Sequence, residues 1–310
     1  LFVTWELIGT AFDCESADVL EVVTTQLNAM YRSYEGQPVT FWRHNIRERF
    51  TDTLFRESGN HYADEVSRLY YEGIEKKGFR RNRLFLTVCF RPFSALDKSE
   101  RKRMPKAQKV KELDEALQDM LDIKKSLDSY LSRFTARVLG TFEHNGLVFS
   151  SQMAFYEYLL THQWRNVRVT NTPLSDILGS ADLFFSSDSG QVSHIDGTSY
   201  FRGLEIKEYS PDVGTGIMDN LLYAPCDYVA TQSYTCMSRE EARNRIVSTR
   251  KRLISADDDA VSQRMELEVA LDLLQSGVIA FGKHHFSLMV FADSLDALVD
   301  GAGEISNGLN

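Results

Sequence analysis

Two long heptad-patterned stretches constrain the fold of this chain more than any other feature. Between Lys106 and Val138, apolar residues recur at three- and four-residue intervals, in a rhythm that only Lys124 interrupts. This spacing predicts one helix about 48 Å long, at a rise of about 1.5 Å per residue. A second long helix is predicted over residues 238–276, where Ser238 and Glu241 have the spacing of a capping box.

The side chains along the two seams suggest that these helices pair. Large residues in one seam can nest against small residues in another, which would bring the two helices together. The alternative is that each helix packs on its own sheet, because a heptad pattern defines a face but no partner. The first seam is Val110, Leu113, Leu117, Met120, Leu127, Leu131, Phe134 and Val138; the second is Ala242, Ile246, Thr249, Leu253, Ala256, Ala260, Gln263, Leu267, Ala270 and Leu274.

Shorter strand and helix signals alternate along the rest of the chain. Segments rich in aromatic and β-branched residues predict strands, and amphipathic segments between them predict helices. A hairpin turn is predicted at His144-Asn145-Gly146. The predicted strands are 2–9, 39–45, 83–90, 181–186, 200–209, 227–236, 278–281 and 286–291, and the predicted short helices are 16–34, 61–77, 151–161 and 216–223.

This element order predicts an α+β fold. Counted from Phe2 and again from Tyr200, each half contains strand, helix, strand, helix, strand, helix. We therefore expect two related lobes of mixed or antiparallel sheet with helices, at residues 1–140 and 141–310. The first lobe would end in the long helix, and the second would contain the helix at 238–276.

Composition and charge narrow the function classes. Hydrophobic residues make up 43% and charged residues 25%, which indicates a folded, soluble chain rather than a disordered or collagen-like one. The 44 acidic side chains outnumber the 35 basic ones, and the net charge of −9 argues against direct binding of nucleic acid.

Three further features concern the cell compartment and the extent of the chain. The four cysteines are far apart in sequence and are expected to be reduced thiols in a cytosolic compartment; they are Cys14, Cys89, Cys226 and Cys236. No apolar run approaches the roughly 18 residues that a membrane span needs. Residue 1 is Leu rather than Met, which predicts that the chain is a piece of a longer protein.

The segment from Gly277 to His284 has the spacing of a phosphate-binding loop, G-x-x-x-x-G-K, except at its last position. His284 stands where Ser or Thr would present a hydroxyl group to Mg²⁺. The intervening Val-Ile-Ala-Phe favours a strand, and no helix is predicted directly after it. We therefore assign no catalytic, cofactor-binding or metal-binding residue here or elsewhere in the chain.

Four other polar clusters are better explained by structural roles. Neighbouring side chains in a strand diverge, and consecutive residues on a helix lie about 100° apart, so adjacent residues do not converge on one metal ion. An edge salt bridge or a solvated loop explains the remaining clusters. The clusters are His284–His285; Asp257–Asp259; Glu205, Lys207 and Glu208; and Arg101–Arg103 with Lys106 and Lys109.

Five phrases in the second half, in this order, resemble one protein family. They are G-L-E-I-K-E-Y at 203–209, G-I-M-D-N-L-L at 216–222, Y-V-A-T-Q-S-Y at 228–234, R-K-R-L at 250–253 with D-D-A-V-S-Q at 258–263, and F-G-K-H-H-F-S-L at 281–288. Together they are similar to the N-terminal region of the CagE/TrbE/VirB family, in its VirB subunit-four type. These proteins are the ATPases of bacterial type IV secretion and conjugation. The first half carries weaker phrases, at Trp42–His44 and Arg83–Pro92.

The resemblance implies a function for the chain. In that family a RecA-like ATPase domain with its own phosphate loop lies downstream, so ATP and Mg²⁺ are expected in the parent protein, with no cofactor in this chain. The implied role is an N-terminal assembly and docking domain, which places an ATPase hexamer on the inner-membrane channel for pilus biogenesis and DNA or protein transfer. The implied location is the cytoplasmic face of the bacterial inner membrane, reached through other secretion-channel proteins.

One alternative of a different class stays open at this point. A stand-alone nucleotide-binding phosphotransferase could use the Gly277–Lys283 loop, although only the spacing supports it. A nucleotide-binding measurement separates the two functions, because the docking domain is expected to bind none.

Overall fold

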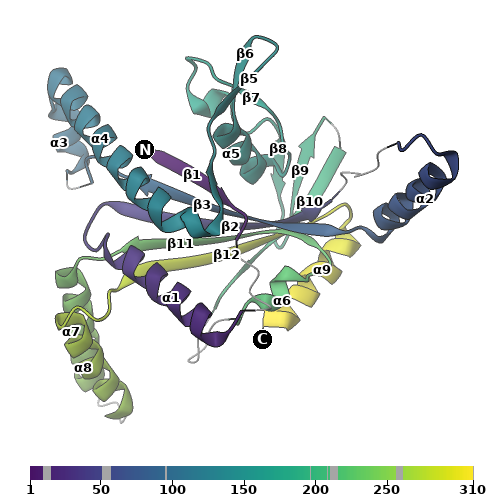
Figure 1. The fold of residues 1–310 in the computed structure, drawn as a ribbon. Coiled ribbons are helices and arrows are strands. Elements are labelled where there is room, and N and C mark those ends of the chain that lie inside the picture. Colours follow the sequence, from purple (N-terminus) through teal and green to yellow (C-terminus); the bar gives the residue numbers. More distant parts are fainter. Residues whose placement is uncertain are drawn as a thin grey trace. The chain divides into compact units, whose positions relative to one another are not determined.

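The computed structural model describes residues 1–9, 15–50, 57–94, 96–195, 197–207, 209, 216–255 and 261–309. Figure 1 shows their helices and strands. The chain divides into two compact units. The first unit contains Leu1–Arg43, Leu86–Val138 and Gln232–His285, and the second contains His44–Phe85, Leu139–Thr231 and Phe286–Asn310. The α+β class is confirmed. Neither unit coincides with the expected lobes 1–140 and 141–310, because each is assembled from three chain segments.

In the first unit, hydrogen-bonded strands follow the order β4-β1-β3-β2-β11-β12. β1 and β4 are antiparallel, with Trp5 opposite Val138. The strands are β1 (Phe2–Leu7), β2 (Val39–Arg49), β3 (Arg80–Phe90), β4 (Ala136–Val138), β11 (Asp227–Cys236) and β12 (Gly282–Ala292). The helices are α1 (Ala17–Arg32), α3 (Lys98–Arg103), α4 (Lys106–Leu131), α7 (Arg239–Ser255) and α8 (Val261–Gln275).

In the second unit, the strand order is β3-β2-β11-β12-β10-β9-β8, and β5-β6-β7 form a separate small sheet. Four strands, β2, β3, β11 and β12, therefore have residues in both units. The further strands are β5 (Thr141–His144), β6 (Leu147–Ser150), β7 (Val167–Arg168), β8 (Asp182–Phe185), β9 (Gly190–His194) and β10 (Gly197–Glu205). The helices are α2 (His61–Lys77), α5 (Ser151–Thr161), α6 (Asp219–Leu222) and α9 (Leu295–Leu309).

The core of the first unit is formed by α1, α4 and one face of the strands. Met30 of α1, Leu127 and Leu131 of α4, and Trp5 of β1 are almost completely buried in it. The Trp5 indole N–H donates to a carboxylate oxygen of Asp128 at 2.7 Å, so the polar edge of this buried ring is satisfied. The apolar residues of α4 thus anchor the helix to the sheet.

The prediction that one helix continues from Lys106 to Val138 is wrong at its C-terminal end. α4 ends at Leu131, a short 3-10 turn covers Ser132–Phe134, and Thr135 adopts a left-handed conformation with φ of 50°. The chain then enters β4. Phe134 and Val138 still pack on the same core. The apolar spacing therefore predicted correctly that these two side chains face the core, although the backbone is not helical there.

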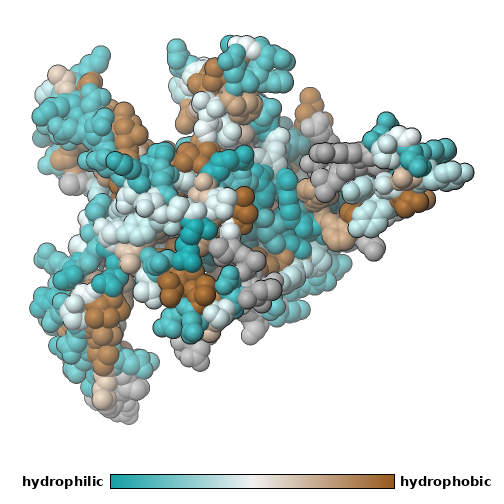
Figure 2. All heavy atoms as spheres, in the orientation of Figure 1, coloured by the Kyte–Doolittle hydropathy of each residue, from teal (hydrophilic) through white to brown (hydrophobic). Residues whose placement is uncertain are grey.

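Only the C-terminal part of the α4 seam is buried. The residues that pack inward are Ala116, Met120, Ile123, Leu127 and Leu131, whereas Val110, Leu113 and Leu117 are 43–51% exposed. Figure 2 shows hydrophobic side chains at the surface along α4. The seam is therefore divided between a packed half and an exposed half.

The long helix predicted over 238–276 is two helices, α7 and α8, which pack against each other. Ala242 and Ile246 of α7 contact Leu274 of α8 in a small core of their own. Ile246, Leu267 and Leu274 of the predicted seam thus pack in this small core, and the predicted pairing with the 106–138 helix is not confirmed. Asp257–Asp259 lie outside the described residues.

In the second unit, the predicted hairpin is confirmed. β5 and β6 pair with His144 opposite Leu147, and Asn145 and Gly146 both have positive φ, as a tight type I′ turn requires. The following helix α5 starts at Ser151, because the Ser150 hydroxyl accepts a hydrogen bond from the N–H of Met153.

Helix α5 carries a fully buried carboxylate. Glu157 is 0% exposed and accepts hydrogen bonds from the backbone N–H of Gly179 at 2.8 Å and of Ser180 at 3.1 Å. The Ser180 hydroxyl also donates to it, and the Arg165 guanidinium lies 3.2 Å away. These four donors fix the 165–180 segment to the helix.

Sequence analysis missed β9 and α9, and residues 278–281 are not a strand. β9 contains Gly190, whose missing side chain leaves room for the Phe201 ring of β10 directly opposite.

The Arg101–Arg103 run, expected in a loop, is the exposed last turn of α3. Asp97 and Glu100 form a capping box at the N-terminus of this helix. Within the described ranges, no helix is long and apolar enough to cross a lipid bilayer.

Candidate functional site

The Gly277–Lys283 loop is the cap of a helix followed by a strand. Gly277, with φ of 73°, donates its N–H to Leu274, and the N–H of Val278 donates to Leu273 at 2.9 Å. These amides satisfy the last carbonyl groups of α8, so they are not turned toward a ligand. A helix C-terminus also carries partial negative charge, which disfavours phosphate.

Lys283 and His284 belong to β12 rather than to a phosphate cradle. The Lys283 ammonium lies 3.0 Å from a carboxylate oxygen of Glu241 on α7. Burial and the neighbouring His285 lower the pKa of His284. In the part of the chain that the structure describes, no group of three His, Cys, Asp or Glu side chains is placed to hold a metal ion.

The remaining clusters from the sequence do not converge on a site. Glu205 is the last residue of β10, Lys207 follows the strand, and Glu208 lies outside the described residues. Cys89, Cys226 and Cys236 are free thiols, and burial raises the pKa of Cys236 to about 11. Cys14 is also outside the described residues.

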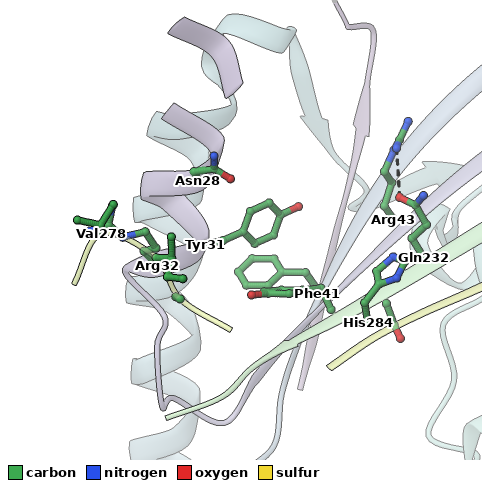
Figure 3. Close-up of a pocket in the computed structure, with 12 residues that line it drawn as sticks. Asn28, Tyr31, Arg32, Phe41, Arg43, Gln232, Val278 and His284 are labelled. Carbon is green, nitrogen blue, oxygen red and sulfur yellow. Dashed lines mark hydrogen bonds between the residues drawn. The ribbon is translucent and has the colours of Figure 1, made fainter. Parts of the chain in front are cut away.

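A cavity of about 400 Å³ in the first unit is the strongest candidate for a binding site (Figure 3). We call it the Tyr31 pocket. Parts of α1, β2, β11, β12 and the 278–280 loop surround it. Its lining residues are Asn28, Tyr31, Arg32, Phe41, Arg43, Gln232, Ser233, Tyr234, Val278, Ile279, Ala280 and His284.

Three aromatic rings form the apolar part of the Tyr31 pocket. Tyr31 packs edge-to-face on Phe41, with ring centres 4.9 Å apart, and on Tyr234 at 5.5 Å. Burial raises the pKa of Tyr234 to about 12 and also raises that of Tyr31, so both phenols are neutral at physiological pH. The rings therefore present a preformed, uncharged surface.

Two guanidinium groups give the pocket its charge. Arg43 donates to the side-chain oxygen of Gln232 at 3.2 Å, and Arg32 donates to the carbonyl oxygen of Gly277. Both acceptors are neutral. Among the described residues, neither Arg32 nor Arg43 forms a salt bridge, so no carboxylate of this part of the chain pairs directly with either cation.

The shape of the pocket depends on a glycine in β12. A Cβ atom on Gly282 would lie 2.3 Å from ring carbons Cε2 and Cζ of Tyr234. We expect Gly282→Ala to displace that ring and to lower the free energy of unfolding by about 1–3 kcal/mol. Urea denaturation of the purified chain measures this.

A control and a double variant test the cause. Gly203→Ala on β10 places its Cβ at an ordinary 3.4 Å from the Met289 sulfur and should cost less. In the Tyr234→Ala background, Gly282→Ala should cost clearly less than it does alone. An equal cost in both backgrounds would show that the ring is not the reason for the glycine.

Comparison with known proteins connects the chain to a family. A family model described as "CagE, TrbE, VirB family, component of type IV transporter system" matches residues 137–310, more than half of the chain. The chain belongs to the CagE/TrbE/VirB family. A second model, "Type IV secretion system ATPase VirB4/TrbE, N-terminal domain", matches residues 1–97.

Similar proteins of the CagE/TrbE/VirB family come from several bacteria. The chain is 30% identical to the type IV secretion system protein virB4 of Brucella suis over 307 residues, which cover 95% of the chain and 37% of that protein. It is 29% identical to virB4 of Bartonella quintana over 94% of the chain and 38% of that protein. It is 26% identical to the type IV secretion system protein PtlC homologue of Bordetella bronchiseptica, over 93% of the chain and 36% of that protein. The chain thus spans under two fifths of these relatives.

Two of the five phrases that resemble this family supply residues of the Tyr31 pocket. Gln232, Ser233 and Tyr234 end the phrase at 228–234, and His284 lies in the phrase at 281–288. Arg43 lies in the weaker phrase Trp42–His44. Sequence analysis assigned no site to these residues, because contacts between segments so far apart in the chain cannot be predicted from one sequence.

Proposed function

We propose that this chain is the assembly and docking region of a type IV secretion ATPase, and that ATP is hydrolysed in a RecA-like domain downstream in the parent protein. The match of residues 1–97 to the N-terminal domain of VirB4/TrbE ATPases carries the proposal. The Gly277–Lys283 geometry supports it, because a capped helix C-terminus is unsuited to phosphate.

Partners and location form part of the same proposal. The parent protein assembles as a hexamer and reaches the cytoplasmic face of the inner membrane through other channel proteins of the secretion system. Its ATPase activity powers pilus biogenesis and the transfer of DNA or protein. The net charge of −9 supports protein partners over direct contact with nucleic acid or anionic lipid.

Cell fractionation tests the docking role. We expect the tagged chain to appear with the membrane fraction in cells that contain the complete secretion system, and to stay in the soluble fraction in cells that lack every other component. Excess chain should also reduce transfer by the complete system, because it competes for docking positions. Equal membrane recovery in both kinds of cell would contradict the proposal.

We expect this chain neither to bind nor to hydrolyse ATP. Lys283 pairs with Glu241 at the surface, so Lys283→Ala should remove less than about 1 kcal/mol of stability. In the parent protein the same substitution should leave ATP hydrolysis within about twofold, since it removes no phosphate contact. Nucleotide titration of the chain and steady-state hydrolysis by the parent protein measure these effects.

The matched comparison is the lysine of the phosphate loop expected downstream. Its replacement should abolish hydrolysis. If Lys283→Ala caused a comparable loss of ATP hydrolysis with an unchanged melting temperature, the Gly277–Lys283 loop would be a nucleotide site. The alternative function, a nucleotide-binding phosphotransferase, would then be favoured.

A further inference from the structure

The two arginines of the Tyr31 pocket lie on opposite sides of its aromatic rings. Figure 3 shows Arg32 beside Val278 at one end, Arg43 beside Gln232 at the other, and the rings of Tyr31 and Phe41 between them. A ligand that fills the pocket would therefore meet a cation, an apolar surface and a second cation in turn. This order suits an apolar group flanked by two anions.

Both guanidinium groups keep donor capacity. A guanidinium has five N–H donors in a planar fork, and the contacts described for Arg32 and Arg43 are single bonds to neutral oxygens. Carboxylates match such a fork with two parallel hydrogen bonds. Glu35 is a carboxylate whose charge reaches Tyr234, and one of its oxygens lies 3.5 Å from the Arg239 guanidinium on α7.

The polar atoms around the rings favour a peptide over a phosphate compound. Phosphate sites use clusters of backbone N–H groups, but the amides of Gly277 and Val278 are occupied in the α8 cap. Side-chain amides and a hydroxyl are present instead, at Asn28, Gln232 and Ser233. Such groups can bond both the N–H and the C=O of a peptide backbone. A volume of about 400 Å³ is within the usual range for binding pockets and accommodates a few side chains.

We propose that the Tyr31 pocket binds an acidic peptide segment of a partner protein, with carboxylates on both sides of one apolar side chain. The choice of a protein partner rests on the proposed docking function. Arg32 and Arg43 each hold one carboxylate, and the rings of Tyr31, Phe41 and Tyr234 receive the apolar side chain.

Peptide titration tests the proposal directly. The probe is a fluorescein-labelled peptide with the sequence Glu-Asp-Phe-Glu-Asp, and its amide counterpart is Gln-Asn-Phe-Gln-Asn. We expect the acidic peptide to bind the purified chain at least about tenfold more tightly than the amide peptide. Arg43→Gln and Arg32→Gln should each weaken its binding about tenfold, and higher salt should weaken it further.

Matched controls separate the pocket from general charge. Arg133→Gln removes the same charge from an exposed position of the same unit, outside the pocket, and should leave affinity within about twofold. Replacing Phe in the probe with Gly should weaken binding at the pocket, because the rings lose their contact. Melting temperatures of all variants show whether they remain folded.

Several results would overturn the proposal. They are equal binding of the acidic and amide peptides, equal loss with Arg133→Gln and Arg43→Gln, displacement of the peptide by ATP or phosphate at lower concentration than by unlabelled peptide, or no saturable binding up to about 1 mM. Membrane recovery of the chain in cells with the complete system is scored separately. If that recovery persists while peptide binding fails, the pocket assignment is wrong and the docking function stands.

Discussion

Leu131→Asp is expected to lower the free energy of unfolding by more than about 4 kcal/mol. Leu131 is 1% exposed at the end of α4, in the core that also contains Trp5 and Met30. The substitution removes a buried apolar side chain, at about 2–5 kcal/mol, and places a carboxylate among the apolar side chains of this core. Because proteins of this size are stable by about 5–15 kcal/mol, the variant should be largely unfolded or strongly shifted in urea.

Leu117→Asp on the same helix is the matched control. Leu117 is 45% exposed, so its replacement should change the free energy of unfolding by less than about 1 kcal/mol. Urea denaturation and size-exclusion chromatography of both variants measure stability and assembly. Similar losses in the two variants would contradict the division of α4 into a packed and an exposed half. A selective loss of assembly in Leu117→Asp would show that a second chain covers the exposed half.

Glu157→Ala should produce the second large effect, a loss of about 3 kcal/mol or more. The fully buried carboxylate accepts from Gly179, from Ser180 twice, and from Arg165. Hydrogen bonds to a charged group are worth about 1.5–3 kcal/mol each in favourable cases, and the two backbone N–H groups would lose their acceptor. Glu143→Ala, at an exposed position of β5, should cost almost nothing by comparison.

The pH dependence of stability checks the same carboxylate. Burial by itself would raise the pKa of Glu157, but the hydrogen bonds from Ser180 and Gly179 and the charge of Arg165 outweigh it and hold the pKa below its ordinary value of 4.5. The stabilisation is therefore present above about pH 4.5 and is lost as the pH falls through the lower pKa of the folded chain. Between pH 5 and 3, the unaltered chain should lose more stability than Glu157→Ala does. Parallel curves would refute the assignment.

Local signals predicted most of the strands and short helices correctly. α2, α5 and β11 have the predicted bounds, because an amphipathic or β-branched segment between turn residues needs little information from the rest of the chain. The hairpin at His144–Gly146 was predictable for the same reason: Asn-Gly tolerates positive φ at both positions.

Long-range packing explains the errors. The heptad pattern follows apolar residues along the chain, and it does not distinguish a continuous helix from a helix that turns into a strand, as at Phe134 and Val138. For the 238–276 stretch, the alternation of small and large residues was satisfied within the α7–α8 hairpin, since Ala242 packs with Leu274. The same alternation of small and large residues is expected for one long helix and for two helices that pack against each other in a hairpin.

The Tyr31 pocket was beyond sequence reasoning for a related reason. Arg43 and Gln232 are hydrogen-bonded although 189 positions separate them. Each lies in a segment with an ordinary strand pattern, and only the pairing of strands brings them to one cavity. The charge, spacing and motifs of the sequence therefore do not predict that these two residues line one cavity.

The division of each unit into three chain segments sets the order of events while the polypeptide is being made. β2 lies between β3 and β11 in strand order, yet β11 begins only at Asp227. As the ribosome releases the first half, one edge of β2 has no partner, and such an edge invites pairing with other chains. Contacts between distant segments also form slowly. The nascent polypeptide therefore has a long vulnerable interval, in which protection by a chaperone would raise the yield of folded protein.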